Sequence, residues 1–207
     1  MKQLEGGVNN CKDFSVLFRR IVFIDCMSES ERKHTKHVPI LKHYIEGFED
    51  TFRVDTFVAK SKTDFESIFN TLKYKTKHDI YFLLHIISHG SEEGLKIVNK
   101  DSEKIMWAKL AELLKDINYI MKNQLVLNLT VCNSDEIFKY INLKECNGFS
   151  EIIAFKNSLR FEIALAFNLM FYDYIICEGC IVQDLKTKIK KDFNINNLVC
   201  LTEKEDE

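Results

Sequence analysis

The sequence has little proline and glycine, no basic excess and no long apolar run. One proline and seven glycines among 207 residues leave no linker rich in Pro, Gly or Ser. No internal repeat or low-complexity tract is present, so we expect a single domain. The formal net charge of −2 argues against a protein that neutralises many phosphates. No apolar stretch reaches the length of a membrane span. We therefore expect no direct partner in nucleic acid or membrane.

The N-terminal segment lacks the features of a signal peptide, because its first ten residues are polar and no apolar region follows them. The seven cysteines are odd in number and scattered, so we expect reduced thiols and a cytoplasmic protein. Hydrophobic residues make up 46% of the chain and include 16 Phe, enough for a well-defined core. We expect a flexible segment at 1–18, a domain at 19–201 and an acidic tail at 202–207.

Apolar runs alternate with segments of helical periodicity along nearly the whole chain. The expected strands are Ile21–Ile24, Val54–Val58, Ile80–Ile87, Leu95–Val98, Leu125–Val131 and Ile152–Phe155. The expected helices are Pro39–Phe48, Thr63–Leu72 (with a capping box from Thr63 to Glu66), Trp107–Leu114, Ile137–Ile141, Ser158–Tyr174 and Leu185–Ile189. Because strands separated by helices imply right-handed crossovers, we expect an α/β fold with a mostly parallel sheet and helices on both faces.

A histidine and a cysteine stand at the carboxyl ends of two predicted strands. His89 follows the strand at 80–87, and Cys132 ends the strand at 125–131. Ligands collect at the carboxyl ends of parallel strands, so a base and a thiol are expected at one edge of the sheet. Cysteine suits nucleophilic catalysis because a partial thiolate exists near neutral pH, and a nearby imidazole raises that fraction. We predict Cys132 as nucleophile and His89 as its base; the alternative is that both are core residues.

The neighbours of this pair suggest further assistance. Gly90 has no side chain, so a substrate carbonyl could approach its backbone N–H, and the N–H groups of Gly90 and Cys132 would form an oxyanion hole. Ser134 could cap the helix that follows and place Cys132 beside its positive dipole end. This chemistry requires no metal and no organic cofactor.

Four stretches between about Arg19 and Asp192 share a pattern with one enzyme family. They are the apolar strand Leu84–Gly90 that ends in His-Gly, the "isWxxL" helix entry at Lys104–Leu110, the strand Leu125–Ser134 that ends in Cys and a small polar residue, and the closing strand Ile153–Phe155 with the Phe167–Tyr174 helix and the break at Gly179. In order and spacing they resemble the caspase-like (clan CD) cysteine peptidases, and most closely the bacterial CHAT family.

The resemblance implies a caspase-like three-layer sandwich and a cysteine endopeptidase that cleaves specific proteins. In it His89 would be the general base, Cys132 the nucleophile and Gly90 an oxyanion donor. It also implies a role in bacterial stress, defence or cell death. Because the chain carries no sensor domain, we expect activation by a separate partner protein or by assembly. The alternative is a catalytically silent caspase-fold protein that binds other proteins.

Two residues are candidates for substrate binding. The motif around Cys132 is not the Gln-Ala-Cys-x-Gly of animal caspases, so specificity for Asp is not expected. Thr130 stands where metacaspases, which cut after basic residues, carry an acid. Asp25, at the end of the first strand, could supply a negative charge to the S1 pocket, or it could only cap the next segment.

Other kinds of site have weaker support. A receiver domain needs an Asp at the end of its third strand, where this sequence has His89. A dinucleotide-binding domain needs Gly-x-Gly-x-x-Gly after the first strand, and this sequence has no such motif there. His85 and His89 would lie about 13 Å apart in a strand, too far to share a metal ion. Cys177 and Cys180 have the Cys-x-x-Cys spacing of redox or zinc sites. No second Cys pair accompanies them, which disfavours a zinc or redox role. We expect surface histidines at His34, His37 and His43.

Overall fold

The computed structural model describes residues 20–48, 52–76, 81–97, 103–141, 151–178 and 198–202. Within them, the main sheet contains β1 (Arg20–Asp25), β2 (Arg53–Val58), β3 (Leu83–Ile87), β7 (Val126–Thr130), β8 (Glu151–Phe155) and β9 (Leu198–Thr202). The helices are α2 (Glu29–Thr35), α3 (His37–Glu46), α4 (Lys62–Thr76), α5 (Trp107–Ile120), α6 (Phe161–Asp173), the 3-10 helix η1 (Ser134–Lys139) and the π-helical η2 (Tyr174–Glu178). A smaller antiparallel sheet contains β4 (His89–Ser91), β5 (Gly94–Ile97) and β6 (Glu103–Met106).

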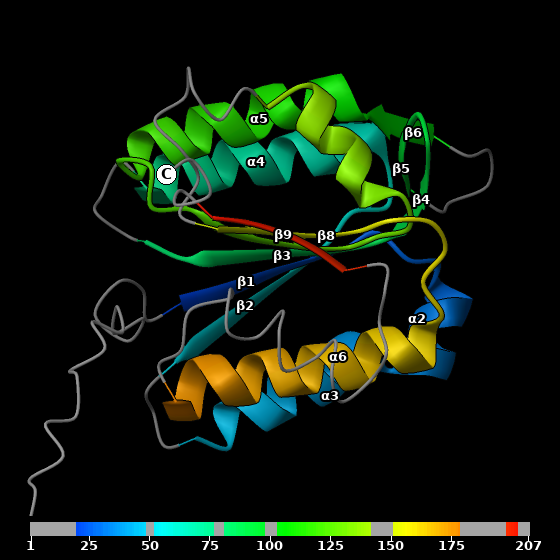
Figure 1. The fold of residues 1–207 in the computed structure, drawn as a ribbon, viewed down its shortest axis with the longest axis vertical. Coiled ribbons are helices and arrows are strands. Elements are labelled where there is room, and N and C mark those ends of the chain that lie inside the picture. The colour runs from blue at the N-terminus through cyan, green and yellow to red at the C-terminus, as the bar shows by residue number, and fades with distance from the viewer. Residues whose placement is uncertain are drawn as a thin grey trace, which may run out of the picture.

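The strand order of the main sheet is β2-β1-β3-β7-β8-β9, parallel throughout except for β9, which runs antiparallel to β8. Helices α4 and α5 cover one face of this sheet, and α2, α3 and α6 lie on the other (Figure 1). The predicted α/β class, with a mostly parallel sheet and helices on both faces, is therefore confirmed.

The central strands are buried at almost every position, and most of their residues are apolar, because each faces a separate core on either side. In β1, Val22 and Ile24 pack in the core beneath α4 and α5, whereas Ile21 and Phe23 pack in the core beneath α3 and α6. All four are fully buried. The alternation follows from the two-residue period of a strand, and it explains why a continuous apolar run marked this segment.

Two details of the predicted helices are wrong. Helix α4 does not begin with a capping box from Thr63 to Glu66. It begins at Lys62, and the Ser61 hydroxyl accepts the Asp64 N–H at 3.1 Å, so the cap lies two residues earlier. Ile163, placed on the buried face of the helix after Ser158, is 38% exposed.

Several elements were not predicted, and some predictions lie outside the described residues. Strands β4 and β6 flank the predicted strand at 95–98, and β9 ends at Thr202, which we had assigned to the acidic tail. Segments 1–18 and 203–207, the break at Gly179 and the helix at 185–189 lie outside the described residues. Among the helices described, none is long and apolar enough to cross a membrane.

Candidate active site

The adjacent strands β3 and β7 bring His89 and Cys132 to the same edge of the sheet. Ile87, the last residue of β3, pairs in parallel register with Thr130, the last residue of β7, and the histidine and the cysteine each follow two residues later. Both side chains line one small pocket of about 20 Å³. Its other lining residues are Ser88, Thr130, Leu159, Phe161 and Ala164. The predicted base and nucleophile therefore share a pocket at the carboxyl edge of the parallel strands.

Gly90 fits this edge only because it has no side chain. A Cβ added at Gly90 would lie 2.0 Å from the carbonyl oxygen of Cys132 and 2.5 Å from Cγ1 of Val131. The backbone of β4 therefore passes directly against the peptide of Cys132. No described residue accepts a hydrogen bond from the Cys132 N–H.

The His89 ring is held by two side chains that the sequence analysis did not identify. Its Nε2 lies 2.6 Å from Oε1 of Glu31. The Phe161 ring stands edge-on to the imidazole, with 5.5 Å between the ring centroids. The side chains of His89 and Glu31 are 35% and 32% exposed, so both are partly screened from water.

Glu31 lies in the first turn of α2, a helix that the sequence analysis missed. Its Oε2 accepts the Ser28 N–H at 3.0 Å and the Ser28 hydroxyl at 2.6 Å, while the Glu31 N–H donates to Ser28 Oγ at 3.2 Å. This is a complete capping box, and the Ser-x-x-Glu spacing was the signal that could have revealed the helix. Nothing in the spacing could have revealed the contact with His89, which lies 58 residues away in the chain.

The Glu31 carboxyl is charged at neutral pH. Burial acts to raise its pKa, but hydrogen bonds from the Ser28 hydroxyl, His89 and the Ser28 backbone outweigh burial and hold the pKa below its ordinary value. A carboxylate has no hydrogen to donate. The contact with His89 is therefore one in which the imidazole donates and Glu31 accepts.

The Cys132 thiol contacts backbone rather than His89. Its Sγ accepts the N–H of Leu159 at 3.2 Å and lies 3.8 Å from the Leu159 carbonyl oxygen. No hydrogen bond joins His89 to Cys132 within the described segments. The thiol is partly exposed, whereas Cys26 is fully buried. Leu159 belongs to the segment between β8 and α6, so that segment controls the position of the sulfur.

The turn after Cys132 is fixed by polar contacts different from those predicted. Asn133 has a positive φ of 54° and caps η1 without a side-chain hydrogen bond. Ser134 does not cap the helix. Its buried hydroxyl donates to the Leu129 carbonyl of β7 at 3.2 Å and accepts the Phe155 N–H of β8 at 2.8 Å. The predicted help from a capped helix dipole is therefore wrong, because a six-residue 3-10 helix follows and Ser134 joins two strands instead.

Thr130 lines the pocket, but its hydroxyl faces the interior. It is 4% exposed and accepts the Asn168 side-chain N–H at 2.9 Å. Its Oγ1 also lies 2.8 Å from Nε2 of His85, whose Nδ1 lies 2.8 Å from the hydroxyl oxygen of Tyr172. The hydroxyl of Thr130 therefore belongs to a buried polar network beneath the site.

Histidines in this network are neutral and structural. His37, expected at the surface, is 4% exposed, and its Nε2 lies 3.2 Å from Nδ2 of Asn168. Burial lowers the pKa of His37 to about 4, and burial lowers that of His85 well below its ordinary value. Within the described segments, no three His, Cys, Asp or Glu side chains form a group that could hold a metal ion.

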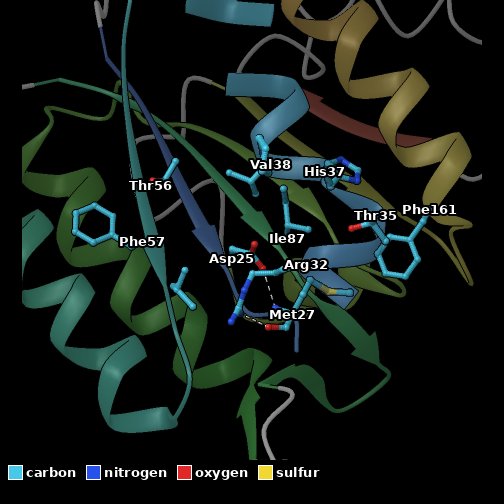
Figure 2. Close-up of a pocket in the computed structure, with 12 residues that line it drawn as sticks. Asp25, Met27, Arg32, Thr35, His37, Val38, Thr56, Phe57, Ile87 and Phe161 are labelled. Carbon is cyan, nitrogen blue, oxygen red and sulfur yellow. Dashed lines mark hydrogen bonds between the residues drawn. The ribbon is translucent and has the colours of Figure 1, made fainter. Parts of the chain in front are cut away.

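Asp25 lines a second, larger pocket (Figure 2). Its Oδ1 accepts the Met27 N–H at 2.9 Å, so it caps the segment after β1 and also lines the pocket. Burial raises the pKa of the Asp25 carboxyl above its ordinary value, although the Met27 N–H and the Arg32 guanidinium act against this. Arg32 also lines the pocket, and it donates to the Met27 carbonyl.

This second pocket has a volume of about 190 Å³ and mostly apolar walls. The apolar lining residues are Met27, Val38, Pro39, Phe57, Val58, Ile87 and Phe161. Phe161 also lines the pocket of His89 and Cys132, so the two pockets share this residue.

In comparisons with known proteins, no protein-family model and no curated protein matches the chain.

Proposed function

We propose that the chain is a cysteine endopeptidase of caspase-like fold, with Cys132 as nucleophile and His89 as general base. The observation that carries the proposal is the shared pocket of His89 and Cys132 at the carboxyl edge of β3 and β7. The close approach of Gly90 to the Cys132 peptide supports it, because it fixes the strand that carries the base against the turn that carries the nucleophile. The order of the motifs, which resembles that of CHAT peptidases, favours a role in bacterial stress, defence or cell death.

The first half of the reaction forms an acyl-enzyme. His89 takes the proton from the Cys132 thiol, and the sulfur forms a bond to the scissile carbonyl carbon while the π electrons move to oxygen. The N–H groups of Gly90 and Cys132 stabilise this oxyanion. When the carbonyl re-forms, the C–N bond breaks, and the imidazolium gives its proton to the departing amine.

The second half releases the product and restores the enzyme. A water molecule gives one proton to His89 as its oxygen bonds to the thioester carbon, and the same N–H groups hold the second oxyanion. Collapse breaks the C–S bond, leaves a carboxylic acid on the product and returns the proton to the thiolate sulfur. No electron leaves or enters, and no cofactor takes part.

The described geometry corresponds to a resting state of such an enzyme. A pocket of about 20 Å³ has room for about one water molecule and not for a peptide side chain. The thiol sulfur accepts a hydrogen bond from the backbone of Leu159 and makes none with His89. We infer that a partner protein activates the enzyme by moving the segment between β8 and α6, which would free the sulfur and widen the pocket.

The pocket at Asp25 serves as the S1 site in this proposal. Its walls are mostly apolar, and the charge of Asp25 is balanced by Arg32, so the pocket is close to neutral. Burying a lone cation in such a pocket is costly, whereas an apolar side chain gains about 25 cal/mol per Å² removed from water. We therefore expect an apolar residue such as Leu, Met or Phe at P1, and not Lys or Arg.

Covalent labelling tests the proposal directly. A peptide with a thiol-reactive electrophile in place of the scissile bond should label Cys132 and spare Cys26, which is buried and whose pKa burial raises. The label should disappear in Cys132→Ala and weaken in His89→Gln. Equal labelling of Cys132 in wild type and His89→Gln would contradict the proposal and favour a caspase-fold protein that binds without cleaving.

A further inference from the structure

Helix α2 contributes a side chain to the candidate active site. Glu31 Oε1 lies 2.6 Å from His89 Nε2, and the two residues come from elements that are distant in the chain. A 2.6 Å contact between an imidazole nitrogen and a carboxylate is a short, charge-assisted hydrogen bond. This contact occupies one of the two ring nitrogens of His89, so only Nδ1 remains to meet a thiol.

The charge of Glu31 decides which tautomer His89 adopts. The carboxylate can only accept, so the hydrogen of a neutral imidazole must lie on Nε2. The lone pair then lies on Nδ1, and a neutral His89 is ready to take a proton through that atom. With the opposite tautomer, Nε2 and the carboxylate would face each other with no hydrogen between them.

The capping box keeps the carboxylate in place. Oε2 of Glu31 is fixed by the N–H and the hydroxyl of Ser28, which leaves Oε1 directed to His89. The two oxygens thus have separate partners, one in the helix cap and one in the active site. A side chain used only for capping would not need the second contact.

We propose that Glu31 is a positioning residue that holds the His89 ring and fixes its Nε2–H tautomer, so that Nδ1 is the atom that deprotonates Cys132. The catalytic part of this inference rests on the proposed peptidase function. The part that concerns the tautomer does not, because it follows from the contact between Glu31 and His89 alone.

Substitution of Glu31 by Gln separates the two roles of this side chain. Glutamine serves at the same position of a capping box, so helix α2 keeps its cap and the protein should fold. With its oxygen kept on the Ser28 N–H, its amide NH2 faces Nε2, which must then accept, so the hydrogen of a neutral imidazole moves to Nδ1. Glu29→Gln is the matched control: it removes a negative charge from the same turn of α2, and Glu29 pairs with the exposed Lys33 and not with His89.

The measurement is ¹⁵N NMR of histidine-labelled protein at about pH 9, where imidazole is neutral, with the His89 signals assigned by their loss in His89→Gln. Wild type and Glu29→Gln should show the Nε2–H tautomer of His89 alone, and Glu31→Gln a substantial share of the Nδ1–H tautomer. With an activated enzyme, Glu31→Gln should lower kcat at least about 10-fold with little change in KM, and Glu29→Gln should change neither.

A single Nε2–H tautomer in Glu31→Gln, or a mixture in wild type, would overturn the inference. An unchanged kcat in Glu31→Gln would overturn its catalytic part. If wild type cleaves no peptide under any condition, the proposed function fails, and the NMR result alone then decides whether Glu31 sets the tautomer of His89.

Discussion

At the scale of single residues, the arrangement of the site depends on the lack of a side chain at Gly90. Gly90 lets the backbone of β4 lie against the carbonyl of Cys132, and no other residue fits there without displacing backbone atoms. The obstacle is rigid, since the nearest atoms belong to the Cys132 peptide and the branched Val131 side chain. Position 90 thus couples the strand that carries the base to the turn that carries the nucleophile.

We predict that Gly90→Ala destabilises the protein by about 2 kcal/mol or more, because the added methyl group overpacks the contact with Cys132. Gly47→Ala is the control. The φ of Gly47 is −72°, and the nearest atom to an added Cβ would be the Tyr44 carbonyl oxygen at 3.2 Å. Urea unfolding of both variants measures the difference. Equal stability of Gly90→Ala and wild type would show that the backbones at 90 and 132 do not meet.

The candidate site could be predicted only where a residue ends a strand. His89 and Cys132 follow apolar runs, and parallel pairing brings such positions together. Glu31, Leu159 and Phe161 come from segments whose approach to the site depends on how whole helices and loops pack. No local pattern encodes such a contact, so the sequence could not supply it.

At the scale of elements, helices α3 and α6 are joined by polar contacts within an apolar layer. His37, at the start of α3, bonds to Asn168 of α6, and Asn168 bonds in turn to Thr130 and Asn128 of β7. Such groups stabilise the interior only while every partner is satisfied. The sequence analysis placed His37 at the surface because helical spacing does not reveal a buried polar partner from a distant helix.

We predict that acid weakens this packing. An unfolded chain binds a proton to His37 near pH 6.5, whereas the folded protein does so only near its pKa of about 4. Stability should therefore fall as the pH is lowered from about 6.5 to about 4, by up to about 3 kcal/mol from this residue.

The free energy of unfolding, measured in urea at several pH values across this range, tests the prediction. His37→Gln keeps a polar partner for Asn168 but does not titrate, so it should lose less stability in acid than wild type. His85 contributes loss in the same direction to both proteins, and His34→Gln, an exposed position on α2, is the control that should follow wild type. Parallel curves for wild type and His37→Gln would contradict the prediction.

At the scale of the whole molecule, two cores on opposite faces of one sheet explain why the fold class was readable from the sequence. Strands that are buried on both faces are apolar at most positions, and helices that are buried on one face carry an apolar residue at every third or fourth position. Elements without such a pattern were missed: the short helix α2, on which no residue is buried, and the small strands β4 and β6. The site draws on these weakly patterned parts, because they surround the carboxyl edge of the sheet.

The most direct test of the central claim is cleavage of a peptide library that varies P1. Wild type, Cys132→Ala and His89→Gln would be compared alone and with proteins encoded beside this one. We predict cleavage by wild type in the presence of an activator, preference for apolar P1 residues, and loss of cleavage in both variants. Preference for Lys or Arg would make Asp25 a charge receptor and contradict the assignment of a neutral pocket. Cleavage that persists in Cys132→Ala, or its absence under every condition, would contradict the claim that Cys132 is a protease nucleophile.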